Sequence, residues 1–104
     1  MTDIELLELA AKAADIDIEW DESLDCWVMP SDEDGWFSVV RWNPLDNSTQ
    51  AFNLAVKLRL DVHIRGIETI VPFRDVRPVK HKENPYAATR RAIVETVAEI
   101  ERAK

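Results

Sequence analysis

Apolar residues recur at helical spacing in three stretches of the chain, at about residues 3–14, 47–58 and 85–103. This spacing places the apolar residues on one face of a helix, where they can be buried together. The pattern therefore predicts three amphipathic helices. The residues expected on the buried faces are Ile4, Leu7, Ala11 and Ala14 in the first helix, Ala51, Phe52, Leu54, Ala55, Val56 and Leu58 in the second, and Tyr86, Ile93, Val97 and Ile100 in the third.

Polar residues mark the start of each predicted helix. Thr2 and Asn47 each stand three residues before a Glu or a Gln, which is the spacing of a capping box. Asn84 is followed by Pro85, and proline is favoured in the first turn of a helix because its missing N–H is not needed there. We expect the three capping side chains to accept hydrogen bonds from free amides of the first turn.

The segment 15–21 alternates strictly between carboxylates and apolar residues. Successive side chains of a strand point to opposite faces of the sheet, so Ile16, Ile18 and Trp20 would share one face and the carboxylates the other. A charged face fits the edge of a sheet, where charge blocks pairing with other chains. We therefore expect a half-exposed edge strand.

Four further segments have the pattern of strands, at residues 26–30, 36–42, 60–65 and 67–73. The segment 36–42 is apolar on both faces apart from two residues, which predicts that both of its faces are covered. Residues 60–65 alternate between apolar and polar, which predicts a half-buried strand. The polar stretch 31–35 is expected to form a hairpin turn.

The predicted order of elements is α, β, β, β, α, β, β, α, with a basic loop at about residues 74–82 before the last helix. A sheet with helices on each side accommodates both features: it buries the apolar faces of the helices, and it covers both faces of the strand at 36–42. The sequence therefore predicts an α+β fold: a three-layer α/β/α sandwich with three helices and a mostly antiparallel sheet of four to five strands. At 104 residues we expect a single domain, residues 1–104.

The composition is typical of a soluble globular protein. Apolar residues make up 46% of the chain, which is too many for a disordered segment. Cys26 is the only cysteine, and a lone thiol is typical of the reducing cytoplasm. The sequence shows neither a signal peptide nor an apolar run long enough to span a membrane. We therefore expect a cytoplasmic protein.

The residue types that carry catalysis or bind metals are not arranged for either purpose. His63 and His81 lie eighteen residues apart, and Cys26 is far upstream of both, which is not the spacing of a zinc site. Only two glycines are present, so a glycine-rich phosphate-binding loop cannot form. We therefore expect no metal, no cofactor and no enzymatic activity.

Charge is distributed unevenly along the chain. The net charge is −7, to which residues 1–46 contribute −11 and residues 47–104 contribute +4. Such polarity has two readings: a solvated acidic surface that keeps a small protein soluble, or a surface for partners of opposite charge. The acidic candidate site comprises Asp15, Asp17, Glu19, Asp21, Glu22, Asp25, Asp32, Glu33 and Asp34. The basic candidate site comprises Arg74, Arg77, Lys80, Lys82, Arg90 and Arg91.

Several short motifs together are similar to one known family. They are LLELAAKAA at 6–14, WNPL at 42–45, LAVKL at 54–58, ATRRAIV at 88–94 and AEI at 98–100. This combination resembles the phage ABA-sandwich domain family, small proteins of tailed phages and prophages with an α/β/α layered fold. The resemblance implies a phage accessory protein in the cytoplasm of the infected bacterial host. It implies no catalytic residue, cofactor or established activity.

Three functions remain open. In the first, the acidic candidate site binds a basic surface of a host protein. Alternate carboxylates of a strand recur every ~6.7 Å, about twice the roughly 3.4 Å between phosphates along one DNA strand, so this face could imitate DNA. A phage protein of this kind would inhibit a nucleic-acid-handling or defence system of the host, as anti-CRISPR proteins do.

In the second, the basic candidate site binds nucleic acid, although the isoelectric point of about 4.7 counts against this reading. In the third, the acidic half of one subunit meets the basic half of another, in a homodimer or a larger homo-oligomer of structural role.

Overall fold

In the computed structural model the chain is described over residues 1–31, 38–73 and 76–104. These residues form three helices and six short strands, in the order α, β, β, β, α, β, β, β, α. The helices are α1 (Asp3–Ala13), α2 (Ser48–Lys57) and α3 (Pro85–Arg102). The strands are β1 (Glu19–Asp21), β2 (Cys26–Ser31), β3 (Ser38–Arg41), β4 (His63–Ile64), β5 (Glu68–Ile70) and β6 (Val79–Lys80).

Each helix begins at the capping residue that the sequence predicts. The side chain of Thr2 accepts a hydrogen bond from the amide of Glu5. Asn47 accepts one from Gln50, and Asn84 accepts one from the amide three residues on. A cap satisfies an amide that has no partner within its own helix. The three predicted helices are therefore confirmed to within about one residue at each end.

The helices α1 and α2 end in the same type of turn, although neither has a glycine there. Asp15 and Arg59 follow the two helices with φ angles of 56° and 54°. The next residue in each case, Ile16 or Leu60, donates its amide back to the last turn of the helix over 2.9 Å. This is the Schellman arrangement, which usually places glycine in the left-handed position. Because Asp15 has this conformation, the extended segment begins after it, and β1 forms only from Glu19 onward.

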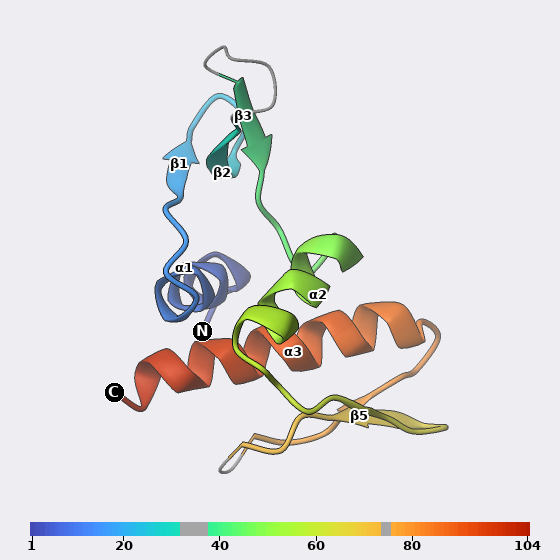
Figure 1. Cartoon of the computed structure of the whole chain (residues 1–104). Coiled ribbons are helices and arrows are strands. Elements are labelled where there is room, and N and C mark those ends of the chain that lie inside the picture. Colours follow the sequence, from blue (N-terminus) through green and yellow to red (C-terminus); the bar gives the residue numbers. More distant parts are fainter. Residues whose placement is uncertain (32–37, 74–75) are drawn as a thin grey trace.

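Helix α3 is the centre of the fold. It packs against α1 and α2 on one side and against β5 and β6 on the other, so that it lies between the helix pair and the second sheet (Figure 1). Its buried side chains are small or medium in size and comprise Ala88, Ala92, Ile93, Val94, Thr96, Val97 and Ala98. Among the described residues, no helix is both long enough and apolar enough to cross a membrane.

The described strands form two separate sheets and not one. The first sheet has the order β1-β2-β3 and the second β4-β5-β6, with all neighbours antiparallel. The α+β class, the three helices, the antiparallel pairing and the edge position of β1 are thus confirmed. The single four- to five-stranded sheet predicted for an α/β/α sandwich is not confirmed, because α2 and α3 separate the two groups of strands (Figure 1). Strand β6 lies in the segment predicted to be a loop.

The first sheet projects from the helices as an arm, residues 15–31 and 38–42 (Figure 1). The arm makes the molecule elongated: the radius of gyration is 14.0 Å, against about 13 Å for a compact chain of this length. At the base of the arm, Trp42 is buried and the indole of Trp27 donates a hydrogen bond to the carbonyl of Ile4. The predicted cover on both faces of residues 36–42 is wrong at Val40 and Arg41, which are exposed, because no helix packs over this part of the arm.

Gln50 joins the arm to α2. Its side-chain oxygen accepts a hydrogen bond from the amide of Asn43 over 2.6 Å, and its side-chain nitrogen donates to the carbonyl of Arg41 over 2.9 Å. Gln50 is buried, so these two backbone groups have little access to water as an alternative partner. One side chain therefore fixes where the arm leaves the helical body.

We predict that Gln50→Ala lowers the free energy of unfolding by about 2 kcal/mol or more, because it leaves two partly buried backbone groups without partners. Asn53→Ala is the control, because Asn53 is exposed on the same helix and its replacement should change stability by less than about 0.5 kcal/mol. Urea unfolding of the three proteins provides the measurement. Equal stabilities for Gln50→Ala and Asn53→Ala would contradict the role assigned to Gln50.

Candidate functional site

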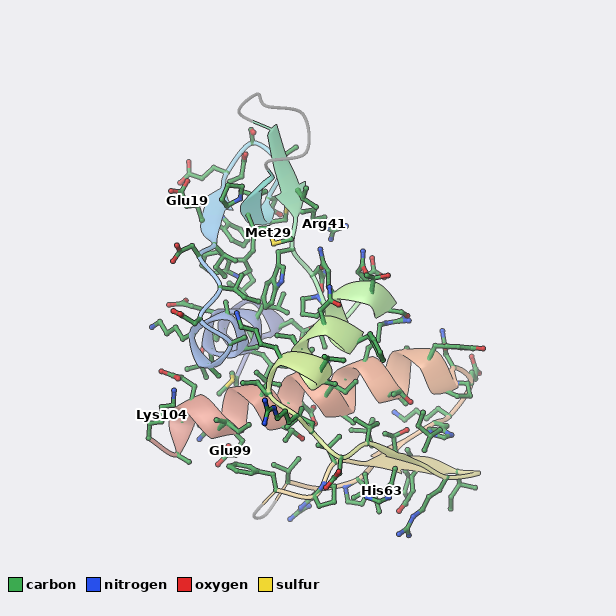
Figure 2. The ribbon with its side chains drawn as sticks, viewed as in Figure 1. Glu19, Met29, Arg41, His63, Glu99 and Lys104 are labelled. Carbon is green, nitrogen blue, oxygen red and sulfur yellow. The ribbon has the colours of Figure 1, made fainter. Side chains whose placement is uncertain are left out.

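The acidic segment of the arm keeps the alternation that the sequence predicts. Asp15, Asp17 and Glu19 are exposed, whereas Ile16 and Ile18 between them are half-buried. The half-buried isoleucines pack against the core of the molecule. The carboxylates therefore face solvent along one side of the arm, where Figure 2 labels Glu19.

The turn at the tip of the β1–β2 hairpin is fixed by the carboxylate of Asp21. One of its oxygens accepts hydrogen bonds from the Ser23 hydroxyl over 2.6 Å, from the Ser23 amide over 2.9 Å and from the Leu24 amide over 3.0 Å. The hydrogen bond from the Ser23 side chain makes the largest contribution to lowering the pKa of Asp21 below its ordinary value of 3.8, because these bonds favour the charged form. Asp25 closes the turn with a φ angle of 53°.

None of the arm carboxylates from Asp15 to Asp25 takes part in a salt bridge among the described residues, where the ion pairs involve α1 and α3. Asp32, Glu33 and Asp34, which complete the acidic candidate site, lie outside the described residues. The predicted hairpin turn at 31–35 lies outside them for the most part as well. Since residues 15–25 contain six acids and no base, this segment of the arm carries an uncompensated negative field.

The residues of the basic candidate site are used in different ways. Arg77, Lys80 and Lys82 are exposed, and Arg74 lies outside the described residues. Arg90 donates hydrogen bonds to the carbonyl of Leu45 and to the hydroxyl of Ser48. Arg91 pairs with Glu95, as its helical spacing predicts, and with Asp3. Two of the six cations therefore bind groups of the chain itself.

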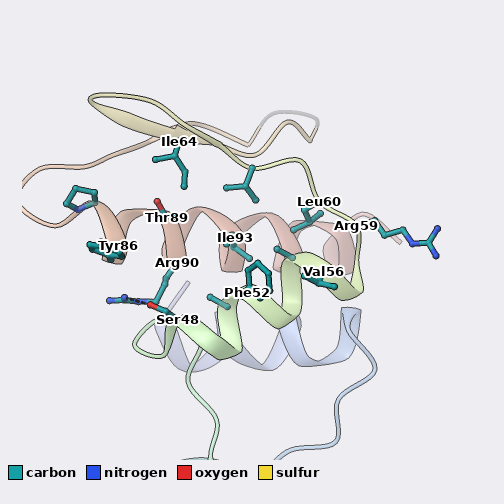
Figure 3. A pocket seen from close by; sticks show the side chains of 14 residues that line it. Ser48, Phe52, Val56, Arg59, Leu60, Ile64, Tyr86, Thr89, Arg90 and Ile93 are labelled. Atoms are coloured by element: carbon teal, nitrogen blue, oxygen red, sulfur yellow. Dashed lines mark hydrogen bonds between the residues drawn. The ribbon is translucent and has the colours of Figure 1, made fainter.

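A second surface feature is an apolar groove of about 920 Å³ between α2, the first turns of α3 and β4 (Figure 3). Phe52 and Val56 of α2, Ile64 of β4 and Tyr86 of α3 line it and are strongly exposed. Its other lining residues are Ser48, Ala51, Ala55, Arg59, Leu60, Val62, Pro85, Thr89, Arg90 and Ile93. The volume lies in the range of ligand-binding pockets.

The charged residues of the groove lie at its two ends. Arg90 lies beside Ser48 at one end, and Arg59 extends from the other (Figure 3). Among the described residues, none that lines the groove carries a carboxylate. The hydrogen bonds of Arg90 hold its guanidinium in place, and such a preordered group loses little entropy when an anion binds. The groove is therefore suited to an apolar group flanked by negative charges.

The groove corrects several expectations about the core. Phe52, Val56 and Tyr86 were expected on buried helix faces, but they are exposed because they face the groove. Ile64 is exposed for the same reason, although the alternation of residues 60–65 predicts that it is half-buried. Ile4 is also exposed, because it lies in the first turn of α1. The apolar stripe of α2 is wider than one packed face requires, but the sequence does not show which residues of the stripe remain uncovered.

Beside the groove, a small polar network joins the second sheet to α3. The hydroxyl of Thr69 lies 2.8 Å from Nε2 of His81 and 2.8 Å from the hydroxyl of Thr89. Thr69 and His81 are buried, so each polar group satisfies another away from water. The network is a structural link. Within the described part of the chain, no group of three or more His, Cys, Asp or Glu side chains is arranged to hold a metal ion.

No protein-family model, no curated protein and no solved structure matches the chain significantly. The resemblance to the phage ABA-sandwich family therefore stays a prediction.

We predict that Phe52→Ala changes the free energy of unfolding by less than about 0.5 kcal/mol, because the Phe52 side chain is 66% exposed. Leu54→Ala in the same helix should cost about 2–5 kcal/mol, because Leu54 is 1% exposed. Thermal and urea unfolding of both variants make the comparison. A large loss of stability in Phe52→Ala would mean that its ring packs into the core and that the groove is closed.

The pKa of Asp21 provides a further prediction. Ser23→Ala removes the hydroxyl that most favours the charged carboxylate, so the pKa of Asp21 should rise toward 3.8. Because the folded-state pKa is lowered, this carboxylate stabilises the fold at neutral pH, and its contribution is lost as the pH falls through the folded-state pKa. NMR titration of the carboxyl carbon of Asp21 in the wild type and in Ser23→Ala tests this shift. An unchanged pKa in Ser23→Ala would contradict the assignment.

Proposed function

We propose that the chain is a small acidic accessory protein that acts by binding another protein through the carboxylates of its arm. The observation that carries this proposal is the exposed row Asp15, Asp17 and Glu19, which makes no salt bridge within the described chain. Exposed carboxylates without partners attract a basic surface and accelerate encounter with it.

The position of the carboxylates supports binding to a large partner. The arm stands away from the helices (Figure 1), so a second protein can approach its acidic side without meeting the helical body. The half-buried Ile16 and Ile18 fasten the same segment to the core and restrict its motion. A charged surface held on an ordered segment loses less entropy on binding than a flexible acidic tail.

The chemistry of the partner follows from the charge. A surface that receives a row of carboxylates carries Lys and Arg, and the surfaces of proteins that bind nucleic acid are of this kind. We therefore propose as the partner a nucleic-acid-handling or defence protein of a bacterial host, which the chain would inhibit by occupying its phosphate-binding surface. The resemblance to phage proteins supports the same proposal. Direct nucleic-acid binding receives less support, because the isoelectric point is about 4.7 and because Arg91 already pairs with Asp3 and Glu95 within the chain.

The double variant Asp17→Lys, Glu19→Lys tests the proposal. The double variant Asp61→Lys, Glu83→Lys is its control, because it makes the same change in net charge at exposed positions outside the arm. Tagged wild type should recover a basic protein from bacterial lysate, and its affinity for that purified protein should fall as salt is raised. The arm variant should bind about tenfold more weakly or worse, whereas the control should bind within a few-fold of wild type. Equal losses in both variants would contradict a specific role for the arm.

A further inference from the structure

The apolar groove and the tip of the β1–β2 hairpin have complementary chemistry. The groove is apolar along its length and has Arg59 and Arg90 at its ends. The tip, residues 22–25, presents Leu24 with 58% of its side chain exposed, between the exposed carboxylates of Glu22 and Asp25. An exposed leucine flanked by carboxylates is the kind of group that the groove is suited to receive.

One molecule cannot bring its own tip into its own groove. The arm leaves the helical body on the side of α1 and α2, whereas the groove opens where α2 and α3 meet β4 on the other side (Figures 1 and 3). Glu19 on the arm and His63 in β4 lie at opposite ends of the molecule (Figure 2). A tip that occupies the groove must therefore belong to a second copy of the chain.

We propose that the chain forms a reciprocal dimer in which residues 22–25 of each copy dock into the groove of the other. Leu24 would contact Phe52 and Val56, and the two carboxylates of the tip would face the arginines at the ends of the groove. Because each copy contributes one tip and one groove, the two contacts are equivalent, and the assembly closes with twofold symmetry.

The shape of the tip and the size of the groove both favour this occupant. The Asp21 carboxylate and the left-handed conformation of Asp25 hold the turn in one shape, so little conformational freedom is lost on docking. The groove volume of about 920 Å³ accommodates a whole turn and not only one side chain. The two contacts also reinforce each other, because formation of the first makes the second intramolecular.

The inference goes beyond the proposed function and does not depend on it. Asp15, Asp17 and Glu19 precede the docked turn and are not part of it, so a dimer would still present two acidic rows. The variant Asp17→Lys, Glu19→Lys should therefore remain dimeric even though it no longer binds a basic partner. A dimer that fails to form and a partner that fails to bind are thus separate results.

Sedimentation velocity over a wide range of concentration tests the dimer, with circular dichroism as the check on folding. Wild type should be dimeric, and high salt should weaken the dimer by screening the charges at the ends of the groove. Phe52→Asp in the groove and Leu24→Asp in the tip should each raise the dimer dissociation constant by about tenfold or more. Ile67→Asp is the control, because Ile67 is 74% exposed outside the groove, and this variant should remain dimeric.

A mixture of the two variants shows whether tip and groove meet each other. Phe52→Asp keeps an intact tip and Leu24→Asp keeps an intact groove, so the mixed pair restores one of the two contacts. Heterodimers should therefore form more tightly than either variant associates with itself. The inference is overturned if wild type is monomeric throughout, if Phe52→Asp and Leu24→Asp dimerise as wild type does, or if the mixture associates no better than its components. Wild-type monomers whose groove binds a different protein would also overturn it.

Discussion

The packing of α3 on both of its sides is the constraint on which the other elements depend. Its buried residues are mostly small or β-branched, among them Ala92, Val94 and Val97. Helix α1 packs against it, and the buried residues of α1 include Ala10 and Ala11. Small side chains allow two helices to approach closely, and they leave little tolerance for added volume. On the opposite side, the second sheet is joined to α3 by packing and by the network of Thr69 and His81. The arm extends from the helices packed around α3, and α3 forms part of the wall of the groove.

The sequence was most informative where structure is determined locally. A helix cap involves residues three apart, so Thr2, Asn47 and Asn84 mark the helix starts correctly. Strand pairing joins residues that are distant in sequence, and no local pattern assigns a strand to one sheet or another. The division into two sheets was therefore missed, and so was β6, because its two residues are too short to show a period.

The acidic row and the apolar groove also differ in whether the sequence alone predicts them. The acidic row could be recognised from the sequence, because alternating carboxylates are exposed on any half-buried extended segment. The groove could not, because Phe52 and Leu54 belong to the same apolar stripe and only the packing of α2 against α3 decides that Leu54 is covered and Phe52 is exposed. Periodicity identifies an apolar face, but it does not say how much of that face another element covers.

Helix α2 takes part in both surface features, and this has a consequence for how they act on each other. Gln50, near the start of α2, fixes the base of the arm. Phe52 and Val56, which lie about one and two turns after the first residue of α2, line the groove. A small rotation of α2 about its axis would move the base of the arm and reshape the groove together. A ligand that favours one orientation of α2 at the groove would therefore change the affinity of the arm for the proposed partner, and that partner would change the affinity of the groove by the same factor. This short helix thus supplies a mechanical connection through which two separate binding events can be coupled.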